Sequence, residues 1–231
     1  MARLERFSLA NHVHWVQVSV SQPQVMAHDM ADLQALWRLW CSQSQSQGVA
    51  VHAYLFDPGQ MSALVTPSHD QAVGVLMQSL GRQYVQRFNR RHHRVGTLWS
   101  GRYRSVLVEA QRWMLPLMTF LGAPDRGGER EGAPHALFLS SEAHYAGVKI
   151  DPLITPHPEV WRLGNTPFAR EAQYTEMVHQ GLSASDLSLM KGALHSGWPL
   201  GEREFVANLQ NQTTRRLTPA KRGRPRKTPS N

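Results

Sequence analysis

The sequence predicts an α+β fold in which an antiparallel sheet carries helices on one face, followed by a small helical unit and a basic tail. Short runs rich in β-branched residues alternate with longer segments whose apolar residues recur at helical spacing. With 231 residues, 41% of them hydrophobic, the chain is long enough to bury the core of one domain and of a smaller unit. After residue 124 the pattern weakens, first into a segment rich in Gly and Pro and finally into a basic one.

The first half of the chain alternates between predicted strands and helices. Four runs with strand composition lie at 12–20, 49–56, 61–67 and 102–109. Three helical patterns lie at 31–45, 71–92 and 110–122. The letters "DPGQ" between the second and third strands supply the turn residues of a hairpin. The order strand, helix, strand, strand, helix, strand, helix predicts a ferredoxin-like sheet with helices on one face.

The second half is predicted to contain short helices and connecting segments. Helices are expected to open at Thr166-Pro167, at Ser183 and near Gly201, from their capping residues and N-terminal prolines. We expect four units: a ferredoxin-like domain at 1–124, a linker with some docked structure at 125–165, a small helical domain at 166–212 and a disordered basic tail at 213–231.

Charge and cysteine content narrow the function classes. Lys and Arg number 25 against 17 acids, which gives a net charge of +8 and favours a polyanionic partner, nucleic acid first and an anionic membrane surface second. Cys41 is the single cysteine, so an intrachain disulfide and a cysteine-based zinc site are excluded. The start "MARLERF" lacks an apolar signal core, and no run is long enough to cross a bilayer. We therefore expect a cytoplasmic protein that is not a membrane protein.

Arginines gather in a segment without acids. Between Asp70 and Glu109 there is no carboxylate, and solvated helix faces usually mix both signs. Arg87, Arg90, Arg91 and Arg94 form pairs spaced three and four residues apart, which places them on one side of the second helix. They could contact several phosphates, although a solvated face remains the alternative. The candidate DNA-binding arginines of this segment are Arg82, Arg87, Arg90, Arg91, Arg94, Arg102 and Arg104.

Aromatic residues lie between these arginines. Tyr84 and Phe88 are in register with the apolar face of their helix and are predicted to lie in the core. Trp99 and Tyr103 have no such register. Trp99 is the aromatic candidate for stacking on an unpaired base, the usual chemistry of single-strand binding.

The end of the chain is basic and has no acid after Glu204. Its "RGRPRK" resembles an AT-hook, in which Gly and Pro keep the backbone extended while arginines enter a narrow minor groove. A nonspecific electrostatic arm is the alternative, and both predict steep salt dependence. The candidate contacts are Arg222, Arg224, Arg226 and Lys227.

Two histidines in "NHVHW", His12 and His14, are the one pattern that could hold a metal ion. On a strand, residues two apart share a face, as metal ligands must. The other reading is a β-branched strand that happens to contain two histidines. We expect no metal site there and keep the pair as the alternative.

Several stretches resemble a known family. "AYLFDPGQMSALVTP" at 53–67 and "LGRQYVQRFNRRHHRVGTLWSGRYRSVLVE" at 80–109 are similar to the HUH single-tyrosine transposases of the insertion-sequence-200 type, above all to the REP-associated tyrosine transposases of bacteria. "GTLWSGRYRS" is the most specific part. The resemblance implies a ferredoxin-like fold, single-stranded or hairpin DNA as substrate, a divalent cation held by two histidines, and a tyrosine that forms a covalent intermediate.

The residues that the family's chemistry needs are replaced in this chain. The histidine pair aligns with Gln60 and Ser62, neither of which offers an imidazole. The nucleophilic tyrosine aligns with Thr119, or with Phe120 after a one-residue gap, and the polar residue that supports the metal aligns with Ala123. The resemblance therefore describes a degenerate member.

The leading hypothesis is a DNA-binding protein of this transposase family that has lost its cleavage chemistry and binds single-stranded or hairpin DNA at the bacterial nucleoid. No cofactor is expected. The alternative is an active transposase or nickase that uses relocated residues, and only that alternative requires Mg²⁺ or Mn²⁺. A decaying gene product is a third reading, and a homodimer remains open.

Overall fold

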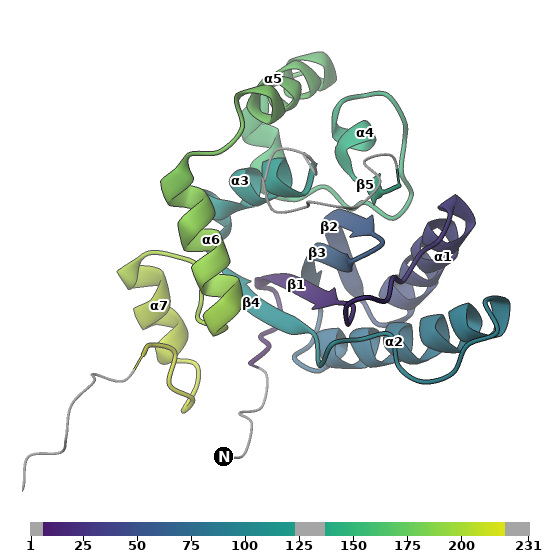
Figure 1. The fold of residues 1–231 in the computed structure, drawn as a ribbon. Helices are drawn as coiled ribbons and strands as arrows, with labels where there is room; N and C mark the ends of the chain where they lie inside the picture. Colours follow the sequence, from purple (N-terminus) through teal and green to yellow (C-terminus); the bar gives the residue numbers. More distant parts are fainter. Residues whose placement is uncertain (1–6, 123–136, 220–231) are drawn as a thin grey trace, which may run out of the picture.

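The computed structural model describes residues 7–122 and 137–219. Its first half runs β1 (Val13–Ser19), α1 (Met30–Ser46), β2 (Val49–Asp57), β3 (Gln60–Pro67), α2 (Ala72–Arg91), β4 (Arg104–Val108) and α3 (Ala110–Gly122). Its second half runs β5 (Leu139–Ser140), α4 (Glu142–Tyr145), the 3-10 helix η1 (Pro158–Leu163), α5 (Pro167–Gln180), α6 (Ala184–Ser196) and α7 (Arg203–Gln210). Figure 1 shows the sheet at the centre of these helices. Within the described ranges, no helix is long and apolar enough to cross a membrane.

The strands form one antiparallel sheet in the order β4-β1-β3-β2-β5. The predicted class, an antiparallel α+β sheet with β1 beside β3, is confirmed. The register assigns side chains to faces: Gln17 of β1 and Leu55 of β2 both pair with Ser62 of β3, so these three share one face. Phe56, the next residue along β2, lies on the other face.

Helices cover both faces of the sheet rather than one. On the Phe56 face, the ring of Trp40 from α1 stacks on Phe56 with centroids 5.6 Å apart. On the Ser62 face, the ring of Phe120 from α3 meets Trp15 of β1 edge-on at 5.8 Å. The predicted one-sided arrangement is thus corrected for α3. The reason is that both faces carry large buried apolar side chains, and an apolar face must be covered.

The segment predicted as a linker contributes to this sheet. Of residues 125–165, the structure describes 137–165, and they hold β5, α4 and η1. Strand β5 pairs with β2, and the hydroxyl of Tyr145 donates a hydrogen bond of 2.6 Å to the carbonyl oxygen of His52. The buried carboxylate of Asp151 accepts hydrogen bonds from Tyr54 and Trp37. This part of the chain is therefore packed against β2, and the exact unit boundaries remain a prediction.

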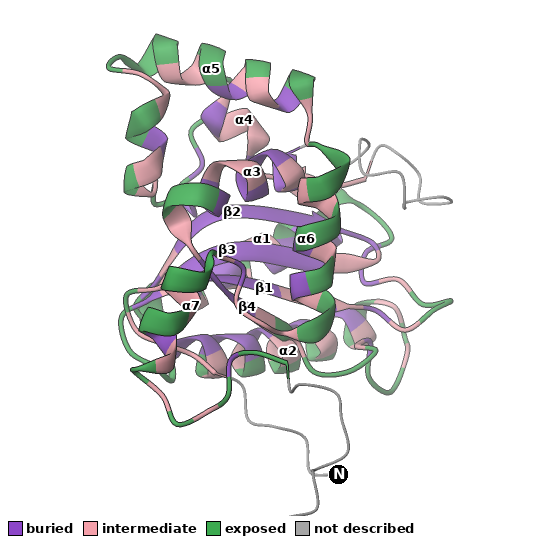
Figure 2. Ribbon diagram, turned by 90° about the vertical axis from the view of Figure 1, so that its left-hand side faces the viewer, coloured by how far each residue is buried: buried purple, intermediate pink, exposed green. Residues whose placement is uncertain are grey.

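The C-terminal helices begin where their caps predict and pack on the same core. Thr166 and Ser183 cap α5 and α6 with their side chains. Tyr174 of α5 lies in the main core cluster, as does Met190 of α6, so the helical unit at 166–212 is docked on the domain. Figure 2 shows buried strands beneath these helices, whose outer surfaces are exposed. The end of α7 forms a second, smaller cluster with Leu107 of β4.

A buried carboxylate joins α1 to α2. Asp32, in the first turn of α1, is 3% exposed and accepts hydrogen bonds from Arg91 and from the backbone N–H of His28. The Nε2 of His92, just after α2, lies 2.9 Å from the same carboxylate. Arg91 also pairs with Asp29, the N-cap of α1, at 2.6 Å. The start of α1 and the end of α2 are therefore held together by one network of charges.

We predict that Asp32→Asn lowers the free energy of unfolding by about 2 kcal/mol, because the neutral amide cannot replace a charged acceptor inside this network. Urea denaturation measures the change. Glu176→Gln, at an exposed position of α5, is the matched control and should change stability by about 0.5 kcal/mol or less. Equal stability of the Asp32 variant and the control would show that the network does not hold the helices.

Candidate nucleic-acid interface

The arginines predicted on α2 divide into two groups. Arg91 is engaged with Asp29 and Asp32, and its guanidinium holds the pKa of Asp29 at about 2 by hydrogen bonding. Arg94 lies beyond the helix and donates hydrogen bonds of 2.9 Å to the side chains of Asn89 and Gln24. Each of these two arginines therefore has a structural partner far away in the sequence: Asp29 and Asp32 for Arg91, and Gln24 for Arg94. Arg87 and Arg90 are exposed and line a shallow pocket together.

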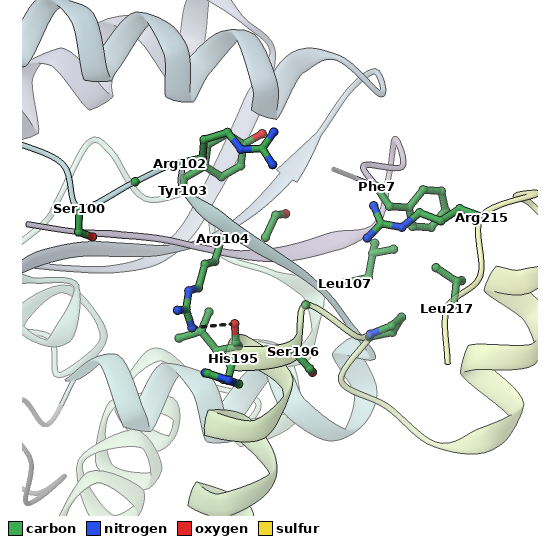
Figure 3. Close-up of a pocket in the computed structure, with 15 residues that line it drawn as sticks. Phe7, Ser100, Arg102, Tyr103, Arg104, Leu107, His195, Ser196, Arg215 and Leu217 are labelled. Carbon is green, nitrogen blue, oxygen red and sulfur yellow. Dashed lines mark hydrogen bonds between the residues drawn. The ribbon is translucent and has the colours of Figure 1, made fainter. Parts of the chain in front are cut away.

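A groove of about 550 Å³ follows the outer edge of β4, and we call it the edge groove. Arg104 lines it from β4, Arg102 lines it from the loop before β4, and His195 lines it from α6. Figure 3 shows Arg102 and Tyr103 at one end, Arg104 beside α6, and Arg215 with Phe7 at the other end. No Asp or Glu is among the described residues that line it. The edge groove is thus a concave surface that three arginines line.

Arg104 keeps its place through α6. Its guanidinium donates a hydrogen bond of 3.4 Å to the carbonyl oxygen of Leu194. Because Arg104 pairs with Gln17 across the sheet, it projects from the Ser62 face, which α6 covers at this edge. Arg215 and His195 were not predicted as site residues, because no local pattern shows that the C-terminal segments return to β4.

A second pocket, the tryptophan pocket, lies between α2 and the loop before β4. It also holds about 550 Å³ and shares Arg102 and Tyr103 with the edge groove, so the two are continuous around this loop. Gly81 of α2 lets Trp99 approach the helix, since a Cβ there would lie 3.3 Å from the indole nitrogen. The indole N–H of Trp99 has no hydrogen-bond partner among the described residues. Arg82 lines this pocket too, which brings three predicted site residues together.

The positions aligned with the family's histidines lie on one face of β3, as strand alternation predicts, but Ser62 is closed off. Ser62 is 1% exposed, and its hydroxyl accepts a hydrogen bond of 2.7 Å from the indole N–H of Trp15. Gln60 is half-buried at the beginning of the strand. Imidazoles at these positions could bind a cation, but a serine bonded to a buried indole offers no open ligand position.

The positions aligned with the nucleophile lie on α3, above the same face. Thr119 is buried, and its hydroxyl donates a hydrogen bond of 3.1 Å to the carbonyl oxygen of Leu115 in its own helix. Phe120 contacts Trp15, whose indole is bonded to Ser62. Helix α3 is thus connected to β3 through Trp15 of β1. Ala123 lies outside the described residues.

His14 does not face this place. It lies three residues from Gln17, which pairs with Ser62, so its side chain projects from the opposite face of the sheet. His14 is fully buried, with Nε2 3.1 Å from the carbonyl oxygen of Leu9 and Nδ1 3.3 Å from the hydroxyl of Ser105. A neutral imidazole satisfies both contacts, because Nε2 donates to the carbonyl oxygen and Nδ1 accepts from the hydroxyl. His12 instead lies 2.9 Å from the carbonyl oxygen of Ala10. Within 7–122 and 137–219, no cluster of three candidate metal ligands is found.

Four of the five tyrosines lie in the core. Tyr84 is buried, as is Phe88, which confirms their predicted packing. Burial raises the pKa of each core tyrosine, which makes its hydroxyl a poorer nucleophile: Tyr54, Tyr84, Tyr145 and Tyr174. The fifth, Tyr103, is half-buried between the edge groove and the tryptophan pocket.

The predicted tail is described only at its beginning. Residues 213–219 are placed, and Leu217 is buried against β4 and α7. The four predicted tail contacts lie outside the described residues, namely Arg222, Arg224, Arg226 and Lys227.

Comparison with known proteins gives a likeness of fold. No family model and no curated protein matches the sequence. The solved structure of a REP-associated tyrosine transposase bound to a REP hairpin matches with a TM-score of 0.50 and 12% identity, over 69% of this chain and 93% of that chain. A provisionally assigned transposase from Deinococcus radiodurans matches with a TM-score of 0.34 and 21% identity, over 51% of this chain and 94% of that one. The first match shows that this chain has the fold of a REP-associated tyrosine transposase.

We predict that His14 makes the fold sensitive to acid. Burial lowers its pKa from 6.5 to about 4, so between these values the unfolded chain binds a proton that the folded protein excludes. The stabilisation is complete above about pH 6.5 and is lost as the pH falls toward 4, and at pH 5 the loss is about 2 kcal/mol. Urea denaturation at pH 7 and pH 5 should show a smaller difference for His14→Gln than for the natural protein.

Ser105→Ala is the control for this measurement, since it removes a partner of His14 and keeps the titrating ring. It should retain the pH dependence of the natural protein. If His14→Gln loses as much stability between pH 7 and pH 5 as the natural protein does, a group other than His14 causes the acid sensitivity.

Proposed function

We propose that this protein is a DNA-binding protein of the transposase type that binds single-stranded or hairpin DNA on the bacterial chromosome without cutting it. The edge groove carries the proposal. It gathers Arg102, Arg104 and Arg215 along a sheet edge, and no Asp or Glu is among the described residues that line the groove. Such a groove follows a phosphate backbone by charge.

The tryptophan pocket supports a preference for unpaired bases. It adjoins the edge groove and offers Trp99 as a flat surface, with Arg82 and Arg102 beside it. A nucleobase supplies a π-face that can stack on this half-buried ring. Base stacking beside a charged groove is the chemistry of single-strand binding. The solved protein with this fold is itself bound to a REP hairpin.

The contacts around Trp15 support the absence of cleavage. Tyrosine transposition chemistry requires a divalent cation and an accessible nucleophile at one place. In this chain Ser62 is bonded to Trp15, and Phe120 contacts the same indole. Among the tyrosines, only Tyr103 is not buried, and it lies on the loop before β4 rather than on α3.

We predict that replacing Arg102 and Arg104 together by alanine weakens binding to every DNA sequence. Two lost phosphate contacts should raise Kd about tenfold and make the slope of log K against log salt shallower by about 2. Fluorescence anisotropy with a labelled single-stranded hairpin at about 50 and about 200 mM salt measures both quantities.

The matched control removes the same charge elsewhere. Arg162, ion-paired with Glu159, and Arg170, placed over the ring of Trp161, lie on η1 and α5. Their double alanine variant should keep Kd within about twofold, as expected for cations outside the contact surface. If both double variants lose affinity equally, binding follows net charge and the edge groove is not the interface.

We predict no covalent adduct and no nick when the protein is incubated with labelled single-stranded hairpin DNA and Mn²⁺ and analysed under denaturing conditions. Binding without cleavage is the expected result. An adduct would establish the alternative, an active nickase. Tyr103→Phe would then identify the nucleophile, because Tyr103 is the one tyrosine that is not buried.

A further inference from the structure

A second basic surface lies between α1 and α2. It is a shallow pocket of about 460 Å³, lined by Leu39 of α1 and by residues from the second half of α2, and we call it the helix groove. The lining residues from α2 are Gln83, Gln86, Arg87, Arg90 and Arg91. None of these residues lines the edge groove or the tryptophan pocket, so the helix groove is a separate surface.

The helix groove and the edge groove belong to opposite faces of the sheet. Trp40 of α1 stacks on Phe56, which places α1 and its neighbour α2 on the Phe56 face. Arg104 projects from the Ser62 face and is held there by α6. Figure 1 shows α1 and α2 on one side of the molecule and α6 on the other. DNA in the edge groove therefore leaves the helix groove open.

Two arginines of the helix groove have no structural partner. Arg87 and Arg90 are exposed, and neither has a hydrogen bond or an ion pair among the described residues. Arg91 is different, because Asp29 and Asp32 pair with it. Helix α2 contains no acid that could pair with the other two. Two like charges three residues apart destabilise a helix, and a bound phosphate would relieve their repulsion.

The side chains of the helix groove fit paired DNA better than unpaired DNA. Guanidinium and amide groups donate hydrogen bonds to phosphate oxygens, and the groove combines Arg87 and Arg90 with Gln83 and Gln86. None of the described residues that line it is aromatic, so an unpaired base would find no ring to stack on. A duplex keeps its bases stacked inside and presents its phosphates to a shallow surface. The tryptophan pocket has the opposite chemistry.

We infer that the helix groove is a second DNA-binding site, at which Arg87 and Arg90 bind the phosphate backbone of a duplex. One protein molecule then holds a hairpin in the edge groove and a duplex in the helix groove at the same time. This bridging of two DNA segments rests on the proposed function, whereas duplex binding by the helix groove does not. Because the contacts are to phosphates, binding is independent of sequence and weakens as the salt concentration rises.

The first measurement tests the site itself, with the full chain and a labelled blunt-ended duplex in fluorescence anisotropy. Replacing Arg87 and Arg90 together by alanine should raise Kd about tenfold and make the slope of log K against log salt shallower by about 2. Replacing both by lysine keeps the two charges and should keep Kd within about threefold. Circular dichroism checks the fold of each variant. Equal affinity of the alanine variant and the natural protein would overturn the inference.

The second measurement tests bridging. A biotinylated hairpin is fixed to beads, the protein is added, and the labelled duplex that the beads retain is measured. The natural protein should retain the duplex. The Arg87→Ala, Arg90→Ala variant should stay on the beads and retain about tenfold less duplex. The matched control is the double alanine variant of Arg162 and Arg170, which removes the same charge on η1 and α5 and should retain as much duplex as the natural protein.

The outcomes separate the inference from the proposed function. If the Arg87→Ala, Arg90→Ala variant retains as much duplex as the natural protein, the second contact lies elsewhere or on a second copy of the chain, and the inference is overturned. An equal loss in the control variant would overturn it too, because retention would then follow net charge. If the beads retain no natural protein, the proposed function fails, and anisotropy with the duplex still decides whether the helix groove binds DNA.

Discussion

The indole of Trp15 is the contact on which the centre of this molecule depends. A buried indole N–H needs an acceptor, and Ser62 on the neighbouring strand supplies it at 2.7 Å. The ring then meets Phe120 and fixes α3 on the sheet, and Tyr174 of α5 packs with it in the same core. Ser62 and Thr119, the positions that the sequence resemblance aligns with a metal ligand and the nucleophile, are both buried.

The basic residues of the edge groove lie at one edge of the sheet. Arg104 of β4 pairs with Gln17 of β1, whereas Ser62 lies on β3, so the proposed DNA contacts and the hydrogen bond of Trp15 involve different residues. Under the proposed function, DNA binding at this edge therefore does not depend on Ser62 or Thr119.

Local patterns predicted the strands, the helices and their caps, because alternation and helical spacing are properties of neighbouring residues. They also identified Gln60 and Ser62 through resemblance, and Arg102, Arg104 and Trp99 through charge and aromatic content. They could not show that Arg91 is paired with Asp32, which lies on another helix. They missed Arg215 and His195, which reach the edge groove only because the C-terminal segments return to β4.

The sequence by itself determined the order of elements, the acid-free arginine segment and the absence of histidines at β3. Each of these is fixed by residue identity or by local spacing. Only the tertiary structure decided that α3 covers the second face, that residues 137–165 pack on β2, and that the segment after α7 returns to β4. The physical reason is that these arrangements depend on contacts between distant residues, and the energy of such contacts comes from burial, which no local pattern records.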